Sequence, residues 1–336
     1  MEQNIIFKTI RLVMKKIIIS ILILTQSISY SQDTFSIVAV DPETGEVGAA
    51  GATCLFGQFG GIADIISSIV PGKGGVISQA YVCIPNINMT NATTLMESGY
   101  SPAQIITWLN NNDYCNAGNY QYRQYGIVDF DDSGNVRTAG FTGNLADDYK
   151  EDRQGATYSI QGNILLNQSV IDNMEYNFLN TEGSLAVKLM AAMQGANFPG
   201  ADSRCLDEGT SSATAFLVVY DPEDLPNQPS LALNIGSQPP GVEPIDLLQE
   251  LFNENLSVEN SLVNELSLFP NPTDGIISIK SNKNYHLEIY SVDGKIILMD
   301  NGNNIDISAL QNGTYFLKVT QENTNNSASF KILKKD

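Results

Sequence analysis

The stretch Thr34-Phe-Ser-Ile-Val-Ala-Val-Asp-Pro-Glu-Thr-Gly-Glu-Val-Gly-Ala-Ala-Gly-Ala-Thr-Cys54 decides the fold, because it encodes two short apolar strands around a tight turn. In the turn, Asp41-Pro-Glu-Thr-Gly45, proline fixes one φ angle and glycine supplies a positive one. We therefore predict a β-hairpin with strands at residues 35–40 and 46–52. A small hydroxyl residue, Thr34, opens the first strand.

Upstream of the hairpin, the chain has the pattern of a secretory signal peptide. A basic start at Lys15 and Lys16 precedes a short apolar run, residues 17–24, and small residues end the segment. The run is well short of the roughly 20 residues that a membrane-spanning helix requires. We interpret residues 1–31 as a cleaved leader, with Met14 as an alternative start, and we expect no transmembrane segment.

The part that follows, residues 32–266, contains no histidine, because the single histidine of the 336-residue chain is His286. Ser-His-Asp and Cys-His catalysis and histidine-based metal sites are therefore excluded from it. Its seven Lys and Arg side chains stand against 29 Asp and Glu, a net charge of −22. Such a surface repels phosphate backbones and anionic lipid, which disfavours nucleic-acid and electrostatic membrane binding.

Four cysteines lie in the same part of the chain: Cys54, Cys83, Cys115 and Cys205. An even number in an exported chain permits two disulfides, and the sequence leaves the three pairings open. The spacing lacks the paired Cys-x-x-Cys of a zinc site. We expect structural bridges or buried thiols, and no metal or other cofactor.

The predicted elements indicate one α+β domain over residues 32–252, with sheets covered by layers of helices. Further strands are expected at residues 75–83, 125–130, 136–142 and 210–220, and helices at residues 91–98, 101–109, 168–179 and 184–193. Asp129-Phe-Asp-Asp-Ser-Gly134 starts like a calcium loop, but Gly140 occupies its twelfth position, which favours a hairpin turn. A proline-containing domain edge and a polar linker, residues 253–266, follow.

Residues 267–336 differ in kind. Short strands separated by Asn, Gly and Asp turns predict a small all-β sandwich, with strands at residues 267–270, 276–280, 286–291, 295–298, 304–307, 314–320 and 328–333. Three motifs and the basic end, residues 331–335, resemble the C-terminal sorting domain of the type IX (Por) secretion system: Leu268-Phe-Pro-Asn-Pro-Thr-Asp-Gly275, Ile289-Tyr-Ser-Val-Asp-Gly-Lys295 and Gly313-Thr-Tyr-Phe-Leu-Lys-Val319. The resemblance implies that the type IX machinery is a partner and that the protein crosses the periplasm and outer membrane.

The main domain resembles the bacterial domain-of-unknown-function family ten-twenty-eight, which is placed among the N-terminal-nucleophile hydrolases. The resemblance rests on Thr34-Phe-Ser-Ile-Val-Ala39, Ile77-Ser-Gln-Ala-Tyr81, Gln124-Tyr-Gly-Ile-Val-Asp129, Tyr158-Ser-Ile-Gln-Gly-Asn-Ile-Leu165, and Gly200-Ala-Asp-Ser-Arg204 with Ser211-Ser-Ala213. It implies a layered αββα sandwich. It also implies hydrolysis of an amide bond by an N-terminal nucleophile, a mechanism that suits a domain without histidine.

In that mechanism the Thr34 hydroxyl attacks a carbonyl while its own α-amine, with a pKa near ~8, takes the proton. The side chain of Asn163 is our candidate for stabilising the oxyanion. Asp202 and Arg204 are candidates for orienting substrate or holding the N-terminus, and Asp129 and Gln79 are weaker choices. Because Gln32 and Asp33 precede Thr34, a second cut, by trimming or self-cleavage, must free the amine.

Lys73 is a further candidate, because a nearby lysine lowers the pKa of a hydroxyl. It lies in the loop Pro71-Gly-Lys-Gly-Gly75, which lacks the spacing of a phosphate-binding loop. Ser36, Ser78 and Ser211 supply hydroxyls for a Ser-Lys pair with it.

Structural interpretations compete with these roles. Thr34 is alternatively the first residue of an edge strand, Asp202 and Arg204 an ion pair beside a disulfide at Cys205, and Gln161-Gly-Asn163 a turn before a helix. The first functional hypothesis is an exported hydrolase that cleaves an amide bond in a peptide, a cell-wall fragment or another small amide. The alternatives are a non-catalytic extracellular ligand-binding module and a purely structural surface protein.

Overall fold

The computed structural model describes residues 34–55, 62–115, 119–281, 283–292, 294–321 and 327–335. The predicted leader, residues 1–31, lies outside the described residues, as do Gln32 and Asp33. Between Gln249 and Glu250 the chain divides into two compact units. Within the described residues, no helix is both long enough and apolar enough to span a membrane.

The first unit contains a six-stranded antiparallel sheet in the order β10-β9-β2-β1-β8-β7. Its strands are β1 (Phe35–Val40), β2 (Val47–Thr53), β7 (Glu151–Gln154), β8 (Tyr158–Gly162), β9 (Thr214–Tyr220) and β10 (Leu231–Ile235). The predicted hairpin is confirmed, since β1 pairs with β2 from Phe35 opposite Ala52 to Val40 opposite Val47. Because β1 also pairs with β8, it is a central strand, and the edge-strand interpretation of Thr34 is wrong.

A second, four-stranded antiparallel sheet has the order β3-β4-β5-β6. It consists of β3 (Ser67–Val70), β4 (Gly74–Gln79), β5 (Gln124–Phe130) and β6 (Val136–Thr142), and it contains the second predicted hairpin. The strand predicted to reach residue 83 ends at Gln79. Ala80 and Tyr81 take left-handed φ angles of 59° and 51°, and this conformation stops an extended strand.

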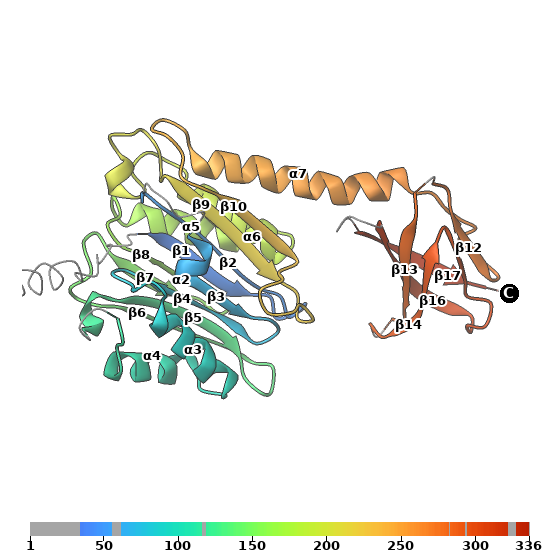
Figure 1. The fold of residues 1–336 in the computed structure, drawn as a ribbon, viewed down its shortest axis with the longest axis horizontal. Coiled ribbons are helices and arrows are strands. Elements are labelled where there is room, and N and C mark those ends of the chain that lie inside the picture. The colour runs from blue at the N-terminus through green and yellow to red at the C-terminus, as the bar shows by residue number, and fades with distance from the viewer. Residues whose placement is uncertain are drawn as a thin grey trace, which may run out of the picture. The chain divides into compact units, whose positions relative to one another are not determined.

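Helices cover the outer face of each sheet (Figure 1). α3 (Ile87–Glu97) and α4 (Pro102–Asn111) pack on the second sheet, and α5 (Ser169–Asn180) and α6 (Leu185–Gly195) pack on the first. A short α2 (Ala63–Ile66) precedes β3, and the 3₁₀ turns η1 (Tyr120–Tyr122) and η2 (Ser203–Cys205) complete the unit. All four predicted helices are therefore present, and Ser101 caps the start of α4 in a capping box with Gln104.

The two sheets face each other, and one part of the space between them is an apolar core. Alternate residues of the facing strands fill it, among them Val38, Val40, Ile77, Val128 and Phe216. A separate apolar core lies between the second sheet and its helices, with Met96, Ile105, Leu109 and Ile127 fully buried. The faces of α5 and α6 that are turned toward the first sheet are buried in the same way.

The four cysteines form two disulfides. Cys54 pairs with Cys205 and Cys83 pairs with Cys115, which selects one of the three pairings that the sequence left open. The first bridge joins the end of β2 to η2, and the second joins the segment after β4 to the segment after α4. The described residues contain no group of His, Cys, Asp or Glu arranged to hold a metal ion.

The segment expected to be a linker, residues 253–266, is helical almost to its end. It belongs to α7 (Pro244–Glu265), a helix of 22 residues that the sequence analysis did not predict. Pro244 stands at its first position, where a missing N–H costs nothing, so this proline starts a helix instead of breaking one. Buried Ile245 and Leu248 pack the first turns of α7 onto the first unit.

After α7, the second unit is all-β, as predicted for residues 267–336. It has a three-stranded sheet of β11 (Leu268–Phe269), β12 (Ile276–Ile279) and β15 (Asn304–Asp306), and a four-stranded sheet of β14 (Ile296–Gly302), β13 (Tyr285–Tyr290), β16 (Gly313–Gln321) and β17 (Ser327–Lys334). Each predicted strand has a counterpart here. Alternating residues such as Leu287, Ile289, Leu317 and Val319 form its core.

Candidate functional site

Thr34 lies at one end of the two-sheet unit, where β1 begins. Its side chain is buried, with 1% of its surface exposed. Its carbonyl oxygen accepts two hydrogen bonds, from the Asn163 backbone N–H at 3.1 Å and from Gln79 Nε2 at 3.0 Å. Asn163 follows β8 of the first sheet and Gln79 ends β4 of the second, so Thr34 is held by both sheets.

The strand alternation fixes the direction of the Thr34 side chain. Residues two apart on a strand point to the same face, and Ser36 points between the sheets, where its hydroxyl donates to Gln79 Oε1 at 2.6 Å. Thr34 therefore faces the same interior. Continued by one residue, the pairing of β1 with β2 also sets Thr34 opposite Thr53.

Next to Thr34, the space between the sheets changes from apolar to polar. Ser36, Gln79, Gln124, Ser159 and Gln161 have no exposed surface, and we call these five residues the glutamine network. Gln161 Nε2 donates to Ser36 Oγ at 2.6 Å, and Gln79 Nε2 donates to Gln124 Oε1 at 2.7 Å. A buried amide without hydrogen-bond partners costs free energy, and these mutual hydrogen bonds offset that cost.

Gln124 anchors the network to the backbone. Its Nε2 lies within hydrogen-bond distance of the carbonyl oxygen of Gly162 at 2.9 Å, the carbonyl oxygen of Glu151 at 3.0 Å and Thr142 Oγ1 at 2.9 Å. Gly162 immediately precedes Asn163. The network thus positions the segment that binds the Thr34 carbonyl group.

Asp202 and Arg204 form an ion pair close to this end of the unit. Asp202 is fully buried, and its Oδ2 atom lies 2.6 Å from Arg204 Nη2 and accepts the Cys54 N–H at 2.8 Å. Arg204, whose side chain is 29% exposed, also donates to Thr53 Oγ1 at 3.3 Å. The pair stands beside the Cys54–Cys205 disulfide, as its structural interpretation requires, and it is linked through Thr53 to the position opposite Thr34.

Two segments with left-handed backbone flank Thr34. Ala80 and Tyr81 follow Gln79, and Ile164, with a φ of 52°, follows Asn163. Asp147 contacts both segments, since its Oδ2 accepts the Tyr81 hydroxyl at 2.8 Å and its carbonyl oxygen accepts the Ile164 N–H at 3.2 Å. Left-handed non-glycine residues cost free energy and cluster at functional sites, so their position supports a site here.

The structure does not bring Lys73 to Thr34. Lys73 lies in the turn before β4, whereas Gln79, which contacts Thr34, ends that strand, about 20 Å away along an extended chain. Its ammonium group forms a surface ion pair with Asp132 at 3.4 Å. The proposed Ser-Lys pairs are not formed either, because Ser36 and Ser211 bond to Gln79 and Glu243, and Ser78 bonds to Asn86.

Asp129, one of the weaker candidates, lies at the same distant end as Lys73. Its buried carboxylate forms two hydrogen bonds with Arg137, of 2.9 and 2.6 Å, across the β5–β6 hairpin. These bonds raise the pKa of Arg137 above its ordinary value. The pair is a structural clamp on the hairpin.

Most of the glutamine network was not predicted from the sequence. Gln79 was a candidate site residue, whereas Gln124 and Gln161 had no role, although both lie in strands that are buried along their whole length. A long polar side chain at an inward-facing position of a buried strand was the sequence signal that could have identified these glutamines. The ion pair of Arg123 and Asp113 was not predicted either. Its side chains are only 2% and 1% exposed, and Arg123 Nη2 lies 3.0 Å from Asp113 Oδ2, close to the Cys83–Cys115 bridge.

The fold and the tail together define an exported protein with a mixed α/β domain and an all-β sorting domain. The chain belongs to the family of unknown function DUF1028, whose model matches residues 34–243. A model described as the secretion system C-terminal sorting domain matches residues 267–335. The protein is therefore exported by the type IX machinery to the cell surface or the extracellular space, where its two disulfides are stable.

Among solved structures, the chain is similar to a protein of the same family from Silicibacter pomeroyi, with 24% identity and a TM-score of 0.52. The match covers 66% of this chain and 88% of that one, and it supports the fold alone. Domains 3 and 4 of rat CD4 match with 7% identity and a TM-score of 0.16 over 62% of this chain and 76% of that one, values too low to carry an argument. Comparison with curated proteins gives no match.

Proposed function

We propose that the first unit is an exported hydrolase of the N-terminal-nucleophile type, which cleaves an amide bond with Thr34 after processing. The arrangement of two facing sheets between two helix layers fits the αββα sandwich of such enzymes. The observation that carries the proposal is the polar end of the sandwich interior. There, a threonine at the start of a central strand faces the glutamine network and is bonded to Asn163.

The reaction needs only groups of this chain. The α-amine of a processed Thr34 takes the proton of its own hydroxyl, Oγ bonds to the carbonyl carbon, and the α-ammonium returns the proton to the leaving amine as the C–N bond breaks. Water then hydrolyses the resulting ester and frees the acid and the enzyme. The Asn163 N–H already binds the Thr34 carbonyl group, so stabilising the oxyanion falls to the Asn163 side-chain amide.

Asp202 and Arg204 support this centre as positioning residues in the proposal. The buried Asp202 fixes the start of η2 and the end of β2, and the half-buried Arg204 presents its guanidinium beside Thr53. The positive charge of a guanidinium there suits a substrate carboxylate. Lys73 has no part in the mechanism, because it lies at the other end of β4.

A non-catalytic ligand-binding module is the second candidate. It is favoured by the burial of the Thr34 side chain and by the bonds that tie Asp202 and Arg204 to the backbone of Cys54 and to Thr53. In this case the same end of the sandwich holds an extracellular ligand without reacting with it. A small amide, a peptide or a cell-wall-derived fragment is the ligand class in both cases.

The state of the mature N-terminus separates the two candidates. We expect mass spectrometry of the secreted protein to find a chain that begins at Thr34, and we expect it to release p-nitroaniline from a panel of aminoacyl and N-acyl p-nitroanilides. Thr34→Ser should keep activity, and Thr34→Ala should lose it at least about a hundredfold, because the nucleophile is gone. The hydrolase proposal would be rejected if the secreted chain began at Gln32 and Thr34→Ala changed neither the processing nor the result of the screen. The ligand-binding module would then be the remaining candidate.

A further inference from the structure

We infer that the solvent face of α4 carries a binding groove for a neutral oligosaccharide, separate from the site at Thr34. A surface groove of about 430 Å³ runs along this face. Its volume lies within the ~300–1,000 Å³ range of small-ligand sites. It is lined chiefly by Tyr100, Gln104, Thr107, Trp108, Asn111 and Asn112.

The groove follows from the amphipathic pattern of α4. Pro102, Ile105, Ile106 and Leu109 are buried on the inward side of the helix. The lining residues fall between these positions, at helical spacing on the opposite side. Trp108 is partly buried against the core between the second sheet and its helices. The other lining residues of this outward face are not part of that core, and Tyr100 and the amide side chains call for another explanation.

Aromatic rings give the groove a stacking surface. Tyr100 is 42% exposed, and Trp108 is the single tryptophan of the chain. Tyr114, 61% exposed, stacks on Trp108 with a centroid separation of 6.3 Å and an interplanar angle of 21°, which holds the indole in place. A pyranose ring presents a face of weakly positive C–H groups, which pack well on the negative face of an aromatic ring.

The polar groups of the groove are uncharged and fixed in direction. Asn111 Nδ2 donates to the Thr107 carbonyl oxygen and Asn112 Nδ2 to the Trp108 carbonyl oxygen, both at 2.9 Å. Gln104 Oε1 accepts the Ser101 N–H at 2.9 Å, which leaves its NH₂ group to donate outward. Fixed amide donors and acceptors match sugar hydroxyls, which both donate and accept.

The absence of charge among the lining residues selects the ligand class. Residues 32–266 carry a net charge of −22, yet the lining residues include no Asp, Glu, Lys or Arg. A charged partner of either sign finds no counter-charge in this groove, and an anionic one is also repelled by the surrounding surface. A neutral sugar chain meets neither penalty, and an exported protein encounters such chains outside the cell.

Calorimetric titration of the full secreted chain with cellohexaose, chitohexaose and maltohexaose tests the inference, with hexagalacturonate as the anionic comparison. We expect saturable binding of at least one neutral hexasaccharide and a matching change in Trp108 emission, which reports on the groove because no second tryptophan contributes. Trp108→Ala and Tyr100→Ala should each weaken binding by at least about tenfold, through loss of the stacking surface.

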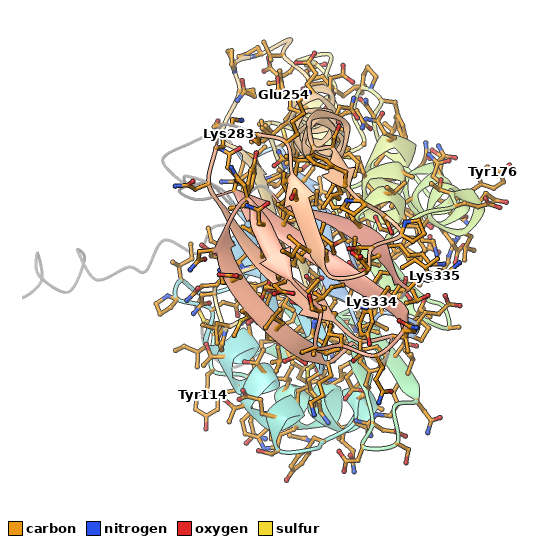
Figure 2. All side chains as sticks on the ribbon, turned by 90° about the vertical axis from the view of Figure 1, so that its right-hand side faces the viewer. Tyr114, Tyr176, Glu254, Lys283, Lys334 and Lys335 are labelled. Atoms are coloured by element: carbon orange, nitrogen blue, oxygen red, sulfur yellow. A yellow bond between two sulfur atoms is a disulfide. The ribbon has the colours of Figure 1, made fainter. Side chains whose placement is uncertain are left out.

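Tyr176→Ala is the matched control, since Tyr176 is 66% exposed on α5, away from the groove. Figure 2 shows Tyr114 and Tyr176 projecting from different parts of the surface. The control should bind as the unchanged protein does, and circular dichroism should show all variants folded. No saturable binding of any neutral hexasaccharide, equal binding of hexagalacturonate, or equal loss in Tyr176→Ala would overturn the inference. None of these outcomes depends on whether Thr34 is catalytic.

Discussion

Gly126 shows how tightly single residues fit around the glutamine network. It lies in β5 and faces the space between the sheets, where a Cβ atom added to it would lie 1.8 Å from Gln161 Oε1 and 2.8 Å from Ser159 Oγ. The Gln161 side chain cannot move away without losing the hydrogen bonds from its Nε2 atom to Ser36. Glycine is thus required here by space, not by an unusual backbone angle.

We expect Gly126→Ala to lower the free energy of unfolding by about 1–3 kcal/mol, the usual cost of overpacking a rigid interior. Urea denaturation of the purified protein measures the change. Gly236→Ala is the matched control, because nothing lies within 4 Å of an added Cβ there. If Gly126→Ala were as stable as Gly236→Ala, the network would have room to rearrange.

Single residues of the site also show what could be predicted from the sequence. Thr34, Asn163, Asp202 and Arg204 were named from short motifs, and the structure brings them to one end of the unit. Lys73 was named from its loop composition, and a whole strand separates it from that end. A motif identifies chemistry that a residue can perform, whereas its distance from other residues depends on which strands become neighbours.

The β5–β6 hairpin shows at the scale of an element how one carboxylate organises a turn. Asp131 Oδ1 accepts the N–H groups of Ser133 and Asn135 at 2.8 and 2.9 Å, and the Asn135 side chain also bonds to Asp131. The hydrogen bond from the Asn135 side chain, followed by those from the backbone, holds the pKa of Asp131 below its ordinary value. The predicted hairpin turn thus has a local electrostatic cause.

We expect the turn to lose stability in acid. A carboxylate whose folded pKa is depressed stabilises the fold above its unfolded pKa of about 3.9, and this contribution is lost as the pH falls through the lower folded pKa. Asp131→Asn keeps an acceptor oxygen but not the charge. It should therefore be less stable than the unchanged protein at pH 7, and the difference should vanish near pH 2.

Urea denaturation at both pH values measures this effect, and Asp132→Asn is the control. The Asp132 side chain is 95% exposed and forms a surface ion pair with Lys73. Surface pairs of this kind contribute little, so its variant should show a smaller difference at pH 7. A pH-independent loss in Asp131→Asn would contradict the electrostatic explanation.

The predicted elements were accurate where their signals are local. Turn residues, helix caps and alternation placed β1, β2, β5, β6 and the four main helices. The short edge strands β3, β7 and β10, the central strand β8 and the long α7 were missed. Edge strands form because a neighbour offers hydrogen bonds, and the first turns of α7 are stabilised by the apolar surface that Ile245 and Leu248 cover.

At the scale of the whole molecule, the two disulfides close loops of very different length. Cys54 and Cys205 are 151 residues apart in sequence, and Cys83 and Cys115 are 32 apart. Closing a longer loop removes more conformational entropy from the unfolded chain. The longer bridge joins β2 of the first sheet to the segment that carries Asp202 and Arg204.

We expect Cys54→Ala/Cys205→Ala to lose roughly 5 kcal/mol of unfolding free energy and Cys83→Ala/Cys115→Ala roughly 4 kcal/mol, on the basis of loop length. Guanidinium denaturation of both double variants under oxidising conditions, against the unchanged protein, measures the losses. A smaller loss for the longer loop would show that changes in the folded state, not chain entropy, dominate at one of the bridges.

The sequence by itself determined the local elements, the export tail and the chemistry on offer, because turns, caps, alternation and residue types act within a few residues of each other. Tertiary structure alone decided which cysteines pair, that β1 is central, that Lys73 is remote, and that three glutamines and two serines meet beside Thr34. These outcomes depend on contacts between residues far apart in the chain. Such contacts exist only after the two sheets have packed face to face.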